Sequence, residues 1–189
     1  VAYYKGCYYM YCTDASYGNV HEGHGHFQGK RSTDLVNWKW VGGPFYDPPS
    51  WVADSLNAIR SRMGLEAIPE EDIQYGYWAP VVRRVNVGGQ EILRMYYSII
   101  IDNYIKTGKA NTPDNFDGSW TERAFIGMCE STDPAGAVWE DKGFVTTSSS
   151  DRGLDYSRSG LSDWNAYFYY NAIDPTYIVT PEGKHYLIH

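Results

Sequence analysis

The chain has 189 residues, of which 43% are hydrophobic and 21% charged, and it carries a formal net charge of −7 at pH 7. This composition is typical of a folded globular chain and excludes a disordered one. The acidic balance argues against nucleic acid as a partner, because a phosphate backbone needs a basic protein face. No run of about 18 consecutive apolar residues occurs, so the sequence predicts no membrane span.

Aromatic residues make up 16% of the chain, with 18 Tyr and 7 Trp. Aromatic side chains fit pleated surfaces, which favours an all-β protein. They also stack on the C–H faces of sugar rings, which favours a carbohydrate-binding protein, and composition alone does not separate the two. The three cysteines, Cys7, Cys12 and Cys129, are odd in number and lack paired spacing. We therefore expect buried free thiols rather than disulfides or a zinc site.

The first part of the chain, residues 1–43, contains a strand-like run at 8–12 and a Ser-Thr-Asp turn at 32–34 that is followed by Trp38. The same succession returns later. Strand-like runs recur at 94–98 and 185–189, Ser-Thr-Asp recurs at 131–133, and a tryptophan follows it again as Trp139. Repeated units of a few short strands are typical of propeller blades.

Between the first two strand runs lies a histidine cluster, His21, His24 and His26. Three histidines in six residues raise the possibility of a metal site. Gly23 and Gly25 oppose a helix, and the only acidic neighbour in sequence is Glu22. We predict a solvated hairpin loop whose histidines do not bind a metal jointly.

An insertion at 44–76 separates the first unit from the second. Val52, Leu56, Ile59 and Met63 fall on one face of a helix. Ser50 can cap its beginning and Gly64 can end it, so the insertion is predicted to contain a helix.

The second unit, 77–146, begins with Tyr77-Trp78-Ala79-Pro80 and contains a further insertion at 102–122. Pro80 is incompatible with a helix and favours an edge strand. Trp78 can be a buried tryptophan that stabilises the blade, or a platform for a sugar ring at the mouth of the propeller. Both interpretations stay open at this point.

A polar loop at 147–170 leads to the third unit, 171–189, which begins Asn171-Ala172-Ile173-Asp174-Pro175. A carboxylate at the beginning of an innermost strand is unusual. Asp174 can form an Asx-type turn, or it can be a desolvated carboxylate tuned by its neighbours. In the second case it should be largely buried, with a polar partner, and lie near Trp78.

The motifs in chain order are similar to glycoside hydrolase family 43, and most similar to its endo-α-1,5-L-arabinanases. In order they read Tyr-Tyr-Met-Tyr-Cys-Thr, Ser-Thr-Asp-Leu-Val-Asn-Trp, Tyr-Trp-Ala-Pro-Val-Val, Met-Tyr-Tyr-Ser, Val-Trp-Glu-Asp-Lys-Gly and Asn-Ala-Ile-Asp-Pro. The resemblance implies an all-β, five-bladed β-propeller, of which residues 1–189 form one incomplete catalytic domain. Two blades and the beginning of a third cannot close a propeller, so we expect that a C-terminal portion is missing.

Members of this family are inverting hydrolases with three acidic residues. By resemblance, Asp174 raises the pKa of the general acid and helps to position it, Trp78 contacts the substrate, and Asn171 faces the cleft. The resemblance places the general base before Val1 and the general acid beyond His189, so this stretch alone is expected to be inactive.

The resemblance implies hydrolysis of α-1,5-linked L-arabinofuranosyl bonds in arabinan, and therefore a plant cell-wall polysaccharide or oligosaccharide such as arabinan or arabinoxylan as partner. An exo-acting α-L-arabinofuranosidase or β-xylosidase of the same fold, and a non-catalytic carbohydrate-binding propeller, are the alternatives. No cofactor is required, although family arabinanases carry a metal ion in the central channel. Degradation of a polymer implies an extracellular or periplasmic enzyme.

Overall fold

The computed structural model describes residues 1–14, 23–62, 64, 66–102, 121–148 and 172–189. Two regions expected to be loops, 103–120 and 149–170, lie outside these ranges. No helix in the described part of the chain is long and apolar enough to cross a membrane.

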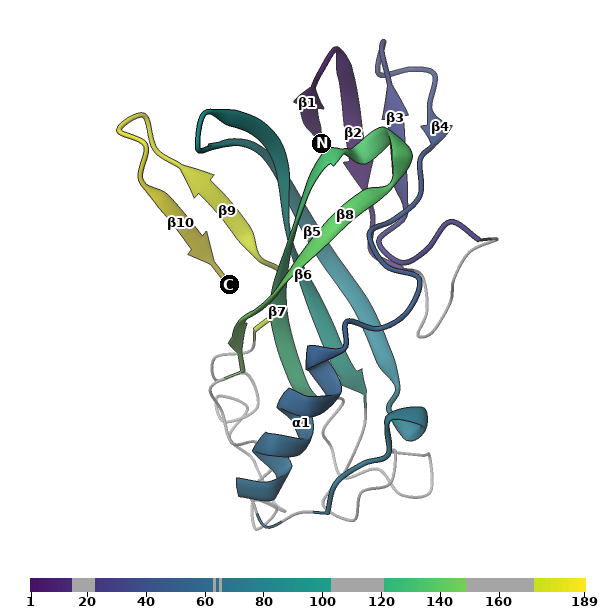
Figure 1. Ribbon diagram of the computed structural model, residues 1–189, viewed down its shortest axis with the longest axis vertical. Helices are drawn as coiled ribbons and strands as arrows, with labels where there is room; N and C mark the ends of the chain where they lie inside the picture. The colour runs from purple at the N-terminus through teal and green to yellow at the C-terminus, as the bar shows by residue number, and fades with distance from the viewer. Residues whose placement is uncertain (15–22, 63, 65, 103–120, 149–171) are drawn as a thin grey trace, which may run out of the picture.

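In the part of the chain that the structure describes, three antiparallel sheets follow one another (Figure 1), so the structure is mostly β and compatible with the predicted all-β class. The first sheet has the order β1-β2-β3-β4, the second β5-β6-β7-β8, and the third is the hairpin β9-β10. The strands of the first sheet are β1 (Ala2–Tyr4), β2 (Cys7–Tyr11), β3 (Gly29–Ser32) and β4 (Lys39–Trp40). Those of the second are β5 (Tyr75–Val87), β6 (Gln90–Asp102), β7 (Thr121–Asp133) and β8 (Val138–Thr147), and the hairpin consists of β9 (Thr176–Val179) and β10 (His185–Ile188).

Strand β6 buries side chains on both faces of the second sheet. Its odd-numbered residues, such as Met95, Tyr97 and Ile99, belong to a core shared with the first sheet. Its even-numbered residues, such as Ile92 and Ile100, pack toward the third unit and its hairpin. Because successive side chains of a strand point to opposite faces, this alternation places the second sheet between two partners.

The first sheet and the hairpin accordingly lie on opposite sides of the second sheet (Figure 1). On one side, Phe27 packs edge-on against Tyr77, and the hydroxyl of Tyr4 donates to the carbonyl of Glu91 at 3.0 Å. On the other side, the ring of Tyr177 lies 4.9 Å from that of Tyr96. The sheets therefore pack face to face in the order in which they occur along the chain.

The helix predicted in the first insertion is present as α1 (Trp51–Arg62), and Val52, Leu56 and Ile59 are buried as expected. Ser50 directly precedes it, and Gly64, with a φ of 70°, follows it. Two short 3-10 helices, η1 (Glu70–Asp72) and η2 (Pro134–Gly136), are the remaining regular elements of the described residues.

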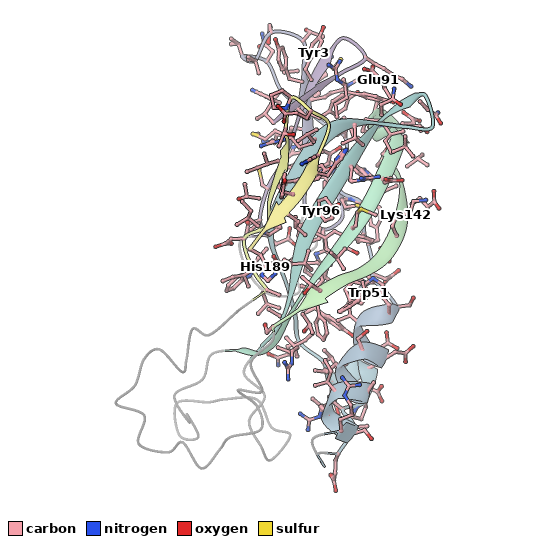
Figure 2. The ribbon with its side chains drawn as sticks, turned by 90° about the vertical axis from the view of Figure 1, so that its left-hand side faces the viewer. Tyr3, Trp51, Glu91, Tyr96, Lys142 and His189 are labelled. Atoms are coloured by element: carbon pink, nitrogen blue, oxygen red, sulfur yellow. The ribbon has the colours of Figure 1, made fainter. Side chains whose placement is uncertain are left out.

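Trp51, at the beginning of α1, attaches the helix to the second sheet (Figure 2). Its ring packs edge-on against Phe125, and its Nε1–H donates to Oδ2 of Asp141 at 3.1 Å. A glycine makes this possible: a Cβ on Gly127 would lie 2.7 Å from the Trp51 ring and 2.5 Å from Tyr97. No larger residue at position 127 leaves space for both rings.

The cysteines differ in part from the expectation. All three are free thiols, but only Cys129 is buried, while Cys7 is half-buried and Cys12 is exposed. Cys129 lies on β7 in the core between the first two sheets, and burial raises the pKa of its thiol well above the ordinary value. Cys12 follows the last residue of β2, where the sheet ends and its face is no longer covered.

The repeated Ser-Thr-Asp motifs form turns. Oδ1 of Asp34 accepts hydrogen bonds from the Ser32 hydroxyl and from the backbone N–H groups of Val36 and Asn37. In the second copy, the Ser131 hydroxyl accepts from the N–H of Asp133, whose Oδ1 accepts from the N–H of Gly136. The motif therefore repeats because the same turn recurs after an equivalent strand.

The Asn37 side-chain amide, the N–H groups of Asn37 and Val36, and the Ser32 hydroxyl hold the pKa of Asp34 well below its ordinary value. A carboxylate with a lowered pKa stabilises the fold above its unfolded pKa of about 3.9 and loses that effect as the pH falls further. We predict that Asp34→Ala lowers the Tm at pH 7, and that the difference from wild type shrinks below about pH 3.9. Thermal melts across this range test the prediction. Thr33→Ala, at an exposed position of the same turn, is the control. A Tm difference between Asp34→Ala and wild type that does not change with pH would contradict the prediction.

Candidate functional site

The second and third units share an unusual backbone conformation directly before a proline. Ala79 has a φ of 46° and precedes Pro80, and Asp174 has a φ of 53° and precedes Pro175. Positive φ is disfavoured for residues with a Cβ, and a following proline restricts the backbone further. Aspartate tolerates this conformation better than alanine. Ala79 lies inside β5, whereas Asp174 lies just before β9.

The Ala79-Pro80 segment forms a β-bulge in β5. Trp78 pairs with Ser98 of β6, the next pair joins Val81 to Tyr96, and the register shifts between them. Trp78 and Val81 are three positions apart, yet both pack on the side of the third unit, whereas Tyr77 and Val82 face the first sheet. The bulge thus sets the direction of the Trp78 side chain.

Trp78 lies close to the beginning of the third unit. It is half-buried and packs against a cluster formed by Ile100, Ala124, Ile126 and Ala172, which Ile173 also contacts. The N–H of Ala172 lies 3.3 Å from the Ser148 hydroxyl, which joins the third unit to the end of β8. The structure therefore brings Trp78 next to the segment that leads into Asp174.

Asp174 itself is exposed, so the expectation that it is largely buried is wrong for the described chain. Asp174 belongs to the turn that leads into β9, and the buried side chains on either side of it are Ala172, Pro175 and Tyr177. The turn directs its apolar residues against the second sheet and leaves the carboxylate outside. Asn171 lies outside the described residues.

A buried arginine lies at the same end of the second sheet. Arg123, on β7, is 3% exposed, and its Nη1 donates to the carbonyl of Ser148 at 2.8 Å. Ser148 also contacts Ala124 and Ala172, so Arg123 adds a positive charge beside the segment that precedes Asp174. The sequence analysis did not identify this residue, because an arginine inside a strand is ordinarily a solvated side chain.

A buried pair of polar side chains lies on the other side of β5. Nδ1 of His26 is 2.6 Å from Oδ2 of Asp14, and the two side chains are 4% and 1% exposed. The His26 ring stacks on Tyr77, with ring centroids 3.5 Å apart and an interplanar angle of 5°. The pair therefore packs against Tyr77, the residue that precedes Trp78.

Burial raises the pKa of the Tyr77 phenol, and the nearby Tyr75, Asp14 and Asp47 raise it further. Tyr77 therefore stays neutral at physiological pH and presents an uncharged ring to His26. Asp14 was not identified from the sequence, although its position directly after a strand and beside the conspicuous histidine cluster was a usable signal.

The histidine cluster is not the solvated loop that the sequence predicted. His24 stacks on Trp40 of β4, with centroids 4.7 Å apart, whereas His26 is buried against Tyr77 of β5. The acidic partner that seemed absent is Asp14, twelve positions earlier in the chain. His21 lies outside the described residues, and within those residues no group of three or more metal-ligating side chains occurs.

No family model, no curated protein and no solved structure matches the chain. Membership of glycoside hydrolase family 43 is therefore a prediction that depends on the order of the motifs.

We predict that His21, His24 and His26 do not bind a metal jointly, because His26 is engaged with Asp14 and His24 with Trp40. Calorimetric titration of the protein with Zn²⁺ should give the same binding isotherm for wild type and for His24→Ala. If wild type binds one equivalent of Zn²⁺ tightly and His24→Ala does not, the prediction is wrong.

Proposed function

We propose that the protein carrying this chain is an inverting glycoside hydrolase that cleaves α-1,5-linked L-arabinofuranosyl bonds in arabinan. The observation that carries the proposal is that Trp78 and the residues just before Asp174 lie together. Two motifs that the resemblance assigns to the substrate site are far apart in sequence, and Trp78 of one and Ala172 and Ile173 of the other belong to the same hydrophobic cluster.

The packing of the sheets supports a propeller as the architecture. Two four-stranded antiparallel sheets and a hairpin follow one another face to face. The second and third units each contain a residue of positive φ directly before a proline, Ala79 within β5 and Asp174 just before β9. A local conformation that recurs from unit to unit is expected when each unit is one blade.

An inverting glycosidase needs a carboxylate that activates water and a carboxylic acid that protonates the leaving oxygen, roughly 6.5–9.5 Å apart. The acid has to remain protonated near neutral pH, and a neighbouring carboxylate achieves this by like-charge repulsion. We assign that role to Asp174. Its carboxylate is exposed in the described chain and is therefore accessible to a second acidic group.

Trp78 supplies the apolar surface in this proposal. A half-buried indole that packs with one edge on a hydrophobic cluster is held in place and still presents ring surface to a ligand. Arabinofuranose offers C–H groups to such a surface. Since a polysaccharide does not cross a membrane, the proposal also places the enzyme outside the cytoplasm.

We predict that Asp174→Asn lowers turnover on linear arabinan by about 10²-fold or more, the scale of lost general acid catalysis. The amide preserves the shape of the side chain and removes its charge, so the pKa of the general acid should fall. The alkaline limb of the pH–rate profile, where the general acid loses its proton, should therefore move to lower pH. The pH–rate profile of the protein that carries this chain measures both effects. Glu182→Gln removes a charge from the turn of the same hairpin and is the matched control. Wild-type turnover with an unchanged pH–rate profile would contradict this role and leave Asp174 with a structural role in its turn.

Replacement of Trp78 tests the substrate surface separately. We predict that Trp78→Ala raises the KM for arabino-oligosaccharides roughly tenfold, which corresponds to about 1.4 kcal/mol. Trp78→Phe should retain part of the affinity, because it keeps an aromatic face. Trp40→Ala removes an exposed tryptophan from β4, in the first sheet, and serves as the control. The pattern of products, a ladder of oligosaccharides or arabinose alone, then distinguishes an endo-acting from an exo-acting enzyme.

A further inference from the structure

We propose that Asp14 and His26 are a positioning pair that fixes the backbone bulge carrying Trp78, and so sets the affinity of the sugar site without touching the sugar. This inference rests on the proposed role of Trp78 as a sugar-binding surface. It assigns a purpose to two buried polar residues that the proposed hydrolysis does not use.

The two side chains of the pair contact each other inside the protein. Oδ2 of Asp14 lies 2.6 Å from Nδ1 of His26, and Oδ1 accepts the N–H of Phe27 at 3.1 Å. Both carboxylate oxygens are therefore engaged inside the protein. A buried carboxylate is costly unless it is paired and hydrogen-bonded, so its orientation is fixed by these partners.

The pair is also anchored to the segment that follows the first sheet. The N–H of His26 donates to the carbonyl of Phe45 at 2.6 Å, in an isolated bridge between the two segments. Phe27, whose N–H is bound by Asp14, packs in the core against Phe45 and Tyr97. Movement of the pair would therefore disturb the packing between the first and second sheets.

From this anchor two hydrogen bonds reach β5, one on each side of Trp78. The N–H of Asp14 donates to the carbonyl of Tyr77 at 3.0 Å, and the Thr13 hydroxyl accepts the N–H of Ala79 at 2.9 Å. The His26 ring adds a stacking contact on Tyr77. The backbone before and after Trp78 is thus held by residues 13, 14 and 26.

The backbone here needs such support. Ala79 has a φ of 46°, which is unfavourable for alanine, and Pro80 restricts it further. A strained conformation of this kind persists only when its surroundings over-determine it. If the support weakens, the bulge relaxes and the Trp78 side chain, whose direction depends on the bulge, changes its orientation.

Four variants separate the components of the pair. Asp14→Asn and His26→Phe disrupt the Asp14–His26 hydrogen bond but keep the size of the side chain or its ring. His26→Asn keeps a donor near the position of Nδ1 and should restore part of the effect. Thr13→Val leaves the buried pair intact and removes only the acceptor of the Ala79 N–H, so it remains informative if a core variant does not fold, and Thr13→Ser is its control.

The measurements are the dissociation constant for arabino-oligosaccharides, kcat and KM on linear arabinan, and the indole N–H resonance of Trp78 in ¹H–¹⁵N spectra, assigned with Trp78→Phe. We expect Asp14→Asn, His26→Phe and Thr13→Val to weaken binding and raise KM by up to about tenfold, the effect of removing Trp78 itself, with kcat changed less than twofold. The Trp78 resonance should move in each of them and return toward its wild-type position in His26→Asn and Thr13→Ser. His24→Ala, whose ring stacks on Trp40, should change none of these quantities.

The spectroscopic measurement keeps the two proposals apart. If wild type neither binds nor cleaves arabinan, the proposed function fails, and the shift of the Trp78 resonance alone decides whether the pair positions it. Folded Asp14→Asn and Thr13→Val variants with an unmoved Trp78 resonance would overturn the positioning role. A resonance that moves while the affinity of an active enzyme is unchanged would overturn the link to sugar binding.

Discussion

The burial of both faces of the second sheet is the constraint on which the rest of the structure depends. Strand β6 carries apolar side chains on both faces, with odd residues toward the first sheet and even residues toward the third unit. A sheet of this kind is unstable unless both faces are covered, since each exposed apolar face costs about 25 cal/mol per Å². The first sheet covers one face and the hairpin covers the other, and the three sheets therefore pack face to face.

The same constraint explains the bulge in β5. An uninterrupted strand would turn every second residue toward the first sheet, and Trp78 and Val81 would then face opposite sides. One extra residue in the Ala79-Pro80 segment changes the alternation, so that Trp78 and Val81 both point toward the third unit. The position is at the edge of the sheet, where a proline removes no ladder hydrogen bond that the sheet needs. The candidate site thus lies at an irregularity in strand pairing, and the packing of the sheet on both faces holds this irregularity in place.

Polar residues in this chain have two kinds of environment. Asp34 and Asp133 are bound by N–H groups of their own turns, so their roles are local and recur with the repeat. Asp14, His26 and Arg123 are buried between elements and bind partners far along the chain. A buried polar group has to be satisfied. Asp14 and His26 bind each other, and Arg123 is bound by the carbonyl of Ser148.

Local patterns in the sequence determined the strands, the helix α1 and the Ser-Thr-Asp turns, because strand alternation, helical periodicity and turn chemistry depend on residues a few positions apart. They also indicated that the segments at Trp78 and Asp174 were special, since a proline at the beginning of a strand is visible in the sequence. Only the tertiary structure decided that Trp78 packs beside Ala172, that Asp174 is exposed, and that His26 is buried against Asp14 and Tyr77. The exposure of a side chain and the identity of its partner depend on which sheet faces cover one another, and that is set by the packing of segments distant in sequence.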